Sequence, residues 1–186
     1  MTSDLLIDEN SVSDAYFVAK ADGVLAGLEV ALRVFALLDE NVSIKRFFKD
    51  GDKVKTGDII AKFHGRTREL LKAERTALNL IQHMSGIATY TNRCAELIKG
   101  TKAVVVDTRK TLPGLRPIQK YSVLMGGGKN HRYCLSDAAM LKDNHIDAYG
   151  GIIPAVNALR EKAGHMVKIE VEVRNFTELE QALSVG

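Results

Sequence analysis

The stretch from Val105 to Ile146 reads VVDTRKTLPGLRPIQKYSVLMGGGKNHRYCLSDAAMLKDNHI, and it decides the fold of the second half of the chain. An apolar run at residues 103–106 overlaps its start, and a second run at residues 138–141 lies near its end. A helical pattern at residues 117–124 separates the two runs. Apolar runs that alternate with helices predict right-handed βαβ units and a parallel sheet.

The same alternation continues towards the C-terminus. Helical spacing at residues 152–162, a strand-like run at 167–173 and helical spacing at 176–183 follow in turn. A closed eight-stranded (β/α) barrel needs about 200 residues or more, whereas 85 residues follow residue 101. We therefore expect an α/β protein in which residues 101–186 form the first part of a (β/α) barrel, incomplete in this chain.

Residues 1–100 have a different pattern of apolar and turn residues, which predicts an α+β sandwich-like domain. A long helical stretch at residues 66–99 ends it and connects it to the second domain. The other expected elements are a β-prone run at 16–19, a helix at 28–38, and strands at 42–48 and 59–63 around a turn-rich segment. Within the long helix, Ser85-Gly86 predicts a kink, a break or a close helix contact.

The composition is that of an ordinary globular protein. Of the 186 residues, 46% are hydrophobic and 26% are charged, and the formal net charge is +3. This balance, without aromatic residues among the basic segments, argues against nucleic-acid binding. No apolar run reaches the roughly 18 residues of a membrane helix, and the first residues lack a signal-peptide pattern. We expect a cytoplasmic protein that binds no membrane, with Cys94 and Cys134 as reduced thiols.

Six basic groups in the quoted stretch stand beside turns or strand ends. They are Arg109, Lys110, Lys129, His131, Arg132 and Lys142. Ligands of parallel α/β structures gather at the carboxyl ends of the strands, so these groups and Glu172 are expected on one rim. Several cations around one pocket predict a substrate with several negative charges. The alternative is a set of surface charges paired with Asp107, Asp137 and Asp143.

Other familiar site patterns are weak or missing in the sequence. The glycine loop at residues 126–129 is not a Walker loop, because Asn130 stands where Ser or Thr is required. No dinucleotide fingerprint is present, and no histidine or cysteine spacing suits zinc, so no metal site of the protein's own is expected. Glu170 and Glu172 share one face of their strand, which suits a functional carboxylate or a solvated face. The segment 51–61 looks like the turn-and-strand phrase of biotinyl or lipoyl carrier domains.

Six phrases of the sequence occur in an order that is highly specific. They are Glu74-Arg75-Thr76-Ala77-Leu78-Asn79, Ser85-Gly86-Ile87-Ala88-Thr89, Asp107-Thr108-Arg109-Lys110-Thr111 with Pro113-Gly114, Gly126-Gly127-Gly128, Asn130-His131-Arg132 and Leu141-Lys142-Asp143-Asn144-His145. They resemble the quinolinate phosphoribosyltransferases, or carboxylating nicotinate-nucleotide pyrophosphorylases. The resemblance implies phosphoribosyl transfer from phosphoribosyl pyrophosphate to quinolinate with decarboxylation. The products are nicotinate mononucleotide, pyrophosphate and carbon dioxide, in NAD biosynthesis.

The resemblance also implies roles for single residues. Four of them match the positions that hold the quinolinate carboxylates: Arg109, His131, Arg132 and Lys142. Lys110 matches a residue between quinolinate and the donor, and Glu172 matches the acid that faces the ribose hydroxyls, with Mg²⁺ expected on the pyrophosphate. Lys110 and Glu172 are thus the expected catalytic residues. Arg75 matches an arginine inserted into the partner subunit's site, which implies a homodimer or a higher homo-oligomer with shared active sites.

Members of this family extend beyond both ends of the present sequence, so we expect the 186-residue chain alone to be inactive. Two other hypotheses remain open from the sequence. One is a related phosphoribosyltransferase-like protein of molybdenum transport, acting on another anionic ring. The other is a carrier or anion-binding module without catalysis, built around residues 51–61.

Overall fold

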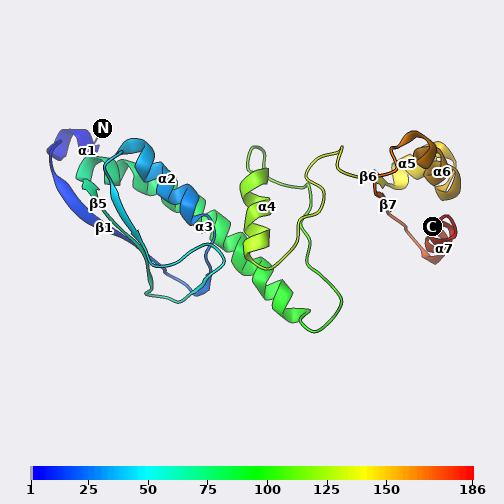
Figure 1. Cartoon of the computed structure of the whole chain (residues 1–186), viewed down its shortest axis with the longest axis horizontal. Helices are drawn as coiled ribbons and strands as arrows, with labels where there is room; N and C mark the ends of the chain where they lie inside the picture. The colour runs from blue at the N-terminus through cyan, green and yellow to red at the C-terminus, as the bar shows by residue number, and fades with distance from the viewer. Residues whose placement is uncertain (1) are drawn as a thin grey trace. The chain divides into compact units, whose positions relative to one another are not determined.

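The computed structural model describes residues 2–186, which form two compact units. One unit ends at His131, and the other is Arg132–Gly186. Each has its own sheet and helices (Figure 1). The domain boundary expected after residue 100 lies just beyond the long helix α3 (Thr67–Leu97) of the first unit.

The first unit contains a three-stranded antiparallel sheet in the order β1-β5-β3. Its strands are β1 (Val12–Val18), β3 (Ser43–Arg46) and β5 (Ile59–Arg66). The shorter elements of this part are α1 (Thr2–Leu6), β2 (Gly23–Val24) and β4 (Lys53–Val54). β2 and β4 pair with each other in an antiparallel manner. The strands expected at 42–48 and 59–63 thus correspond to the paired strands β3 and β5 of this sheet.

Helices α2 (Leu28–Leu38) and α3 pack on one face of this sheet and bury the core. Phe17 from β1, Phe35 from α2 and Phe63 from β5 meet there, with ring centroids between 4.2 and 5.6 Å apart. Tyr16 points to the other face of the sheet and is exposed. This one-sided sandwich is the predicted architecture, and α2 has the bounds that its apolar spacing indicates.

Helix α3 runs for 31 residues without a break, so the helix break considered at Ser85-Gly86 is wrong. Ser85 instead makes a close contact with the main chain of Ala26. Its hydroxyl accepts from the Ala26 N–H at 3.0 Å and donates to the Ala26 carbonyl oxygen at 3.1 Å. A Cβ on Gly86 would meet nothing within 4 Å. The contact that the pair predicts is therefore made by the serine alone.

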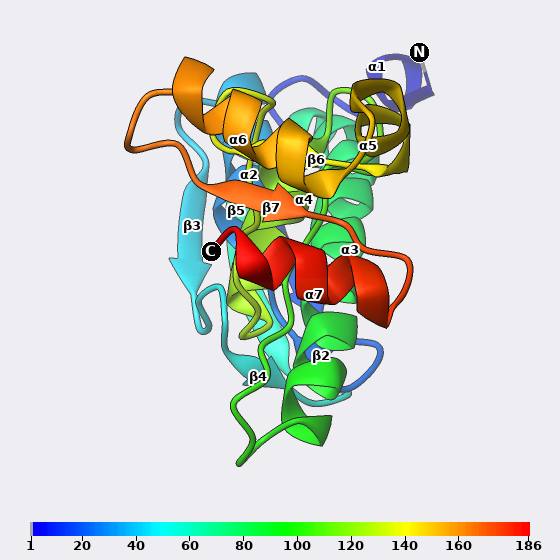
Figure 2. The same cartoon turned by 90° about the vertical axis from the view of Figure 1, so that its right-hand side faces the viewer.

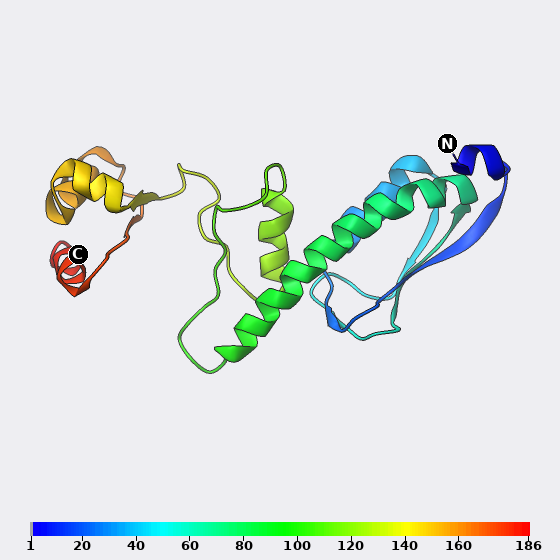
Figure 3. The same ribbon diagram turned by 180° about the vertical axis from the view of Figure 1, so that it is seen from behind.

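Helix α4 (Arg116–Met125) packs against α3, and the glycine loop after it touches α3 directly (Figure 3). A Cβ on Gly126 would lie 2.3 Å from the carbonyl oxygen of Ala88. A Cβ on Gly128 would lie 2.9 Å from a methyl group of Thr91. Because no side chain fits at these two positions, the glycines permit a close backbone approach to α3.

Among the described residues, the strand expected at 103–106 is absent. Val106 makes one parallel bridge with Lys129, and its side chain is 46% exposed. The bridge has two hydrogen bonds, from Lys129 N to Val105 O and from Asp107 N to Lys129 O. A strand needs a continuing ladder of such bonds. The apolar run alone therefore led to a wrong prediction of secondary structure here.

The second unit contains a parallel pair of strands, β6 (Ala139–Leu141) and β7 (Ile169–Val171). Its helices are α5 (Asp143–Tyr149), α6 (Ile152–Lys162) and α7 (Phe176–Ser184) (Figure 2). Ile146, Ile152 and Val156 form its buried core, against which Leu141 and Val171 of the strands pack. The parallel pairing confirms the βαβ prediction, and this unit is part of a barrel that does not close within the described residues.

Helix α5 is not anticipated by the sequence pattern, because only Ile146 of its seven residues is buried. Both cysteines are free and half-buried, as expected of reduced thiols. No helix among residues 2–186 has the length and apolar character needed to cross a membrane.

Asp50 ties α2 and α4 together in the first unit. Its carboxylate accepts hydrogen bonds from the backbone N–H groups of Gly27 and Leu28, at 3.0 and 2.9 Å, where α2 begins. It also accepts from the hydroxyl of Tyr121 in α4, at 2.9 Å. Burial, reinforced by the Asp50 carboxylate, raises the pKa of Tyr121 to about 12. The neutral phenol is thus the form that the fold stabilises.

We predict that this hydrogen bond loses its stabilising effect at high pH. The pKa of Tyr121 is higher in the folded protein than in the unfolded chain, where it is near 10. The contribution is therefore fully present below about pH 10 and is lost as the pH rises towards 12. Urea unfolding at pH 8 to 11.5 should show wild type losing its advantage over Tyr121→Phe above about pH 10. A pH-independent difference would contradict this, and exposed Tyr90→Phe is the matched control.

Candidate active site

Lys120 and Asp107, both within the basic stretch at residues 105–146, form a buried ion pair. The side chain of Lys120, on α4, is 3% exposed, and its Nζ donates to the carboxylate of Asp107, whose side chain is 7% exposed. From its charge alone the sequence suggests Asp107 as a surface partner of the basic groups, and it gives no signal for Lys120, because lysines on helices are mostly exposed. The pair is thus a feature that only the structure reveals.

The same pair holds the main chain of His131. Asp107 Oδ1 accepts the N–H of His131 at 2.8 Å, and Lys120 Nζ donates to the carbonyl oxygen of His131 at 3.0 Å. The side-chain nitrogen of Asn130, oriented towards its acceptors, donates to Asp107 Oδ2 at 2.7 Å and to the Lys120 carbonyl oxygen at 2.9 Å. Both peptide groups that flank His131 are therefore held by buried partners.

Arg109 lies on the loop that follows Asp107. Arg116, at the start of α4, shapes this loop by donating from Nη2 to the carbonyl oxygen of Arg109 at 3.2 Å and from Nε to the Thr111 hydroxyl at 3.1 Å. The Nε of Arg109 is buried and has no hydrogen-bond partner among the described residues. Because an unsatisfied buried donor costs free energy, Arg109 is suited to an anionic ligand that accepts from it.

In the second unit, Lys142 and Glu172 meet where β6 and β7 end. The N–H of Glu172 donates to the carbonyl oxygen of Leu141 at 2.9 Å, which continues the ladder between the strands. Lys142 Nζ then lies 3.1 Å from Glu172 Oε1, and the two side chains are 42% and 52% exposed. Such an exposed pair contributes less than about 1 kcal/mol. The lysine can therefore exchange this contact for an anionic ligand.

Arg132 is the first residue of the second unit, and its side chain contacts residues in and next to β6. Its Nη1 donates to the carbonyl oxygen of Ala138 at 3.0 Å, and its Nη2 lies 3.3 Å from the sulfur of Met140. Asp137 accepts two backbone N–H groups in the intervening turn. These contacts fold the segment between Arg132 and β6 onto itself and place the half-buried guanidinium beside that strand.

The side chains of the remaining candidates are exposed, with one exception. Arg75 is exposed on α3, and none of the hydrogen bonds or ion pairs above involves it. The side chains of Lys110 and Lys129 are also exposed, and Glu170 is half-buried on β7. The structure therefore joins Asp107 to the His131 main chain, and Lys142 to Glu172. No sequence pattern predicts the contact between Asp107 and the His131 main chain. The contact between Lys142 and Glu172 is expected, because both residues follow neighbouring parallel strands.

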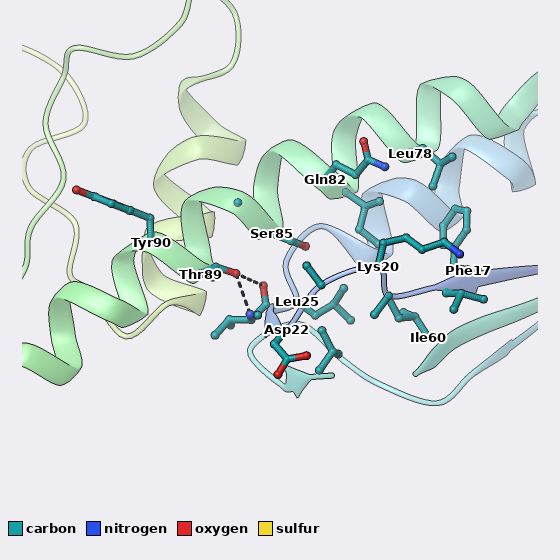
Figure 4. Close-up of a pocket in the computed structure, with 18 of the residues that line it drawn as sticks. Phe17, Lys20, Asp22, Leu25, Ile60, Leu78, Gln82, Ser85, Thr89 and Tyr90 are labelled. Atoms are coloured by element: carbon teal, nitrogen blue, oxygen red, sulfur yellow. Dashed lines mark hydrogen bonds between the residues drawn. The ribbon is translucent and has the colours of Figure 1, made fainter. Parts of the chain in front are cut away.

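An apolar cavity of about 580 Å³ lies elsewhere in the first unit, between α3 and the segment that links β1 to β2 (Figure 4). Phe17, Leu25 and Ile81 line it, and the hydroxyl of Thr89 accepts from the Val24 N–H at 2.9 Å. None of the charged candidates lines it. An apolar wall does not suit a ligand with several negative charges, so the candidate anion-binding groups are those on the cationic loops of each unit.

These loops offer charge and orientation to an anionic ligand. Arginine binds carboxylate or phosphate in a bidentate manner, and lysine supplies a mobile point charge. Among residues 2–186, no group of three or more histidine, cysteine or acidic side chains is placed to hold a metal ion. Mg²⁺ at phosphate sites is held by one or two carboxylates together with the phosphates themselves, and Glu172 is an exposed carboxylate of this kind.

Comparison with known proteins identifies the family. Residues 1–85 match the model of the quinolinate phosphoribosyl transferase N-terminal domain, and residues 87–186 match that of the C-terminal domain. The chain belongs to the quinolinate phosphoribosyltransferase family. It is 46% identical over 186 residues to a protein of Bacillus subtilis named "Probable nicotinate-nucleotide pyrophosphorylase", carboxylating. It is 41% identical over 189 residues to the nicotinate-nucleotide pyrophosphorylase of Mycobacterium leprae.

Solved structures agree with this assignment. NadC from Streptococcus pyogenes matches with a TM-score of 0.96 and 43% identity, covering 100% of this chain and 66% of that one. The nicotinate-nucleotide pyrophosphorylase of Francisella tularensis matches with a TM-score of 0.93 and 41% identity, covering 98% of this chain and 64% of that one. The match to the Bacillus protein includes 100% of this chain but 64% of that protein. The match to the Mycobacterium protein includes 99% of this chain but 65% of that protein. The chain therefore spans about two thirds of the length of these relatives.

Proposed function

We propose that the full-length gene product is a quinolinate phosphoribosyltransferase. It would transfer the phosphoribosyl group of phosphoribosyl pyrophosphate to quinolinate and release pyrophosphate and carbon dioxide, so that nicotinate mononucleotide is formed for NAD biosynthesis. The observation that carries the proposal is the set of cationic loops, in which Arg109 presents a buried, unsatisfied Nε. The names of the similar proteins support the same reaction.

Four residues are proposed to hold the two carboxylates of quinolinate: Arg109, His131, Arg132 and Lys142. The positive charges of the arginines and the lysine would offset the repulsion between a dianion and a donor that carries several phosphate charges. Lys110, exposed on the loop after Arg109, is proposed to lie between quinolinate and the donor. Glu172, whose carboxylate lies 3.1 Å from Lys142 Nζ, is proposed to face the ribose hydroxyls.

The reaction does not require a nucleophile from the protein, because the ring nitrogen of quinolinate attacks the anomeric carbon. The bond from that carbon to the pyrophosphate oxygen breaks, and pyrophosphate leaves with the bonding electrons. The site's tasks are to align the two anions and to stabilise the charge that moves onto the leaving group. The ring nitrogen is then cationic, so it stabilises the electron pair left on the ring when the 2-carboxylate departs as carbon dioxide. A proton replaces the carboxylate there.

Three further properties belong to the proposal. Mg²⁺ is expected with the phosphates of the donor, where it would neutralise charge, with Glu172 as a suitable nearby carboxylate. Arg75, exposed on α3, is proposed to complete the site of a partner subunit, so the active form would be a homodimer or a larger homo-oligomer. The cytoplasm is the proposed location. No observation favours a molybdenum-transport relative or a carrier module.

We predict that Arg109→Ala in the full-length gene product lowers quinolinate affinity at least 100-fold, because a carboxylate then loses its bidentate partner. Calorimetric titration with quinolinate measures the effect directly. Exposed Arg33→Ala is the matched control and should bind as wild type does. Affinity unchanged by Arg109→Ala would refute the assignment of this residue.

Shared active sites make a further prediction. Arg75→Ala and Lys142→Ala should each inactivate the enzyme, but an equal mixture that is unfolded and refolded should regain about one quarter of wild-type activity. Half of the dimers in the refolded mixture are then heterodimers. In each heterodimer one of the two sites carries neither substitution. A mixture as inactive as its components would show that Arg75 acts in its own subunit's site.

A further inference from the structure

We infer that Lys120 is a positioning residue for quinolinate binding, which acts by holding the main chain of His131 through a buried ion pair with Asp107. The inference rests on the proposed function, since it takes His131 and the following residue, Arg132, as carboxylate-binding groups. It adds a residue outside that set, on α4, whose side chain does not reach a ligand.

The burial of Lys120 excludes direct contact with a substrate. Its side chain is 3% exposed, and its Nζ already donates to Asp107 and to the carbonyl oxygen of His131. The exposed Lys110 and Lys129 of the neighbouring loops have the opposite environment. Lys120 therefore cannot act as another cation for the substrate, and any effect on binding has to pass through the residues it holds.

The geometry shows what Lys120 holds. Asp107 accepts the N–H of His131 at 2.8 Å while Lys120 donates to the carbonyl oxygen of the same residue at 3.0 Å. These two side chains also bind each other. The peptide groups on both sides of His131 are thus fixed, and with them the direction in which its side chain leaves the main chain. A candidate binding residue is oriented in this way by a closed set of contacts.

The same pair connects two loops of the candidate site. The N–H of Asp107 donates to the carbonyl oxygen of Lys129 at 3.1 Å, next to the Asn130 side chain that also binds Asp107. Arg109 follows Asp107 by two residues on the other loop. A displacement of Asp107 would therefore move both Arg109 and His131. Such coupling is expected of two residues that bind the same ligand.

Stability alone is a poor reason for such a pair. Replacing a buried ion pair by neutral or apolar groups of similar volume is often neutral or even stabilising, because the desolvation of two charges offsets their attraction. Removing one partner is the harmful change, since it leaves a buried charge without a counter-ion. The pair is better explained by the conformation it imposes on His131, and the difference between single and double substitution provides the test.

The test uses the full-length gene product in three forms: wild type, Lys120→Met, and Lys120→Met combined with Asp107→Asn. Thermal unfolding reports stability, calorimetry reports quinolinate affinity, and steady-state kinetics report KM for each substrate. Lys120→Met should lower both the unfolding midpoint and the quinolinate affinity, the latter at least tenfold. The double variant should regain most of the lost midpoint, because no unpaired charge remains buried, yet keep the tenfold loss of affinity.

Several outcomes separate the possibilities. In both variants KM for quinolinate should rise while KM for phosphoribosyl pyrophosphate stays within about twofold. Lys162→Met, at an exposed lysine of α6, is the control and should match wild type. If Lys120→Met does not fold, the double variant carries the test, because it removes both buried charges. Wild-type quinolinate affinity in the double variant would overturn the positioning role and leave the proposed function intact. A wild-type protein that neither binds nor converts quinolinate would overturn the proposed function itself.

Discussion

The close approach of the glycine loop to α3 is the constraint on which the candidate site of the first unit depends. A side chain at Gly126 would collide with the backbone of α3, 2.3 Å from the carbonyl oxygen of Ala88. With no side chain there, α4 and the loop after it lie directly on the long helix. The chain then returns so that His131 reaches Asp107, and Lys120 on α4 meets both. The packing of two backbones thereby determines where a charged cluster forms.

Much of this fold can be predicted from the sequence, and the elements show why. Helices α2 and α6 have apolar residues at helical spacing along their whole length, and both form with the expected bounds. The run at residues 103–106 has the composition of a buried strand, but strand formation depends on hydrogen bonds to neighbours distant in the sequence. Only Lys129 supplies them among the described residues. Helix α5 was missed for the opposite reason, since a single buried residue gives no periodic pattern.

Some residues of the candidate site can be predicted from the sequence, whereas others appear only in the structure. Arg109, Arg132 and Lys142 can be singled out because they stand at strand ends or turns and within phrases specific to a family. Lys120 has neither signal, and its burial follows from a tertiary contact with Asp107, thirteen residues away. Asn130 belongs to a family phrase, yet its hydrogen bonds to Asp107 and the Lys120 carbonyl oxygen appear only in the structure. Sequence therefore points to candidate ligand-binding groups more readily than to the groups that orient them.

The central claim is the chemistry of the full-length gene product, and labelled quinolinate tests it most directly. Quinolinate carrying ¹³C in its 2-carboxylate is incubated with phosphoribosyl pyrophosphate and Mg²⁺, and the products are followed by NMR spectroscopy. We expect labelled carbon dioxide, unlabelled nicotinate mononucleotide and pyrophosphate in equal amounts. Retention of the label in a nucleotide, or no consumption of quinolinate by the folded protein, would contradict it.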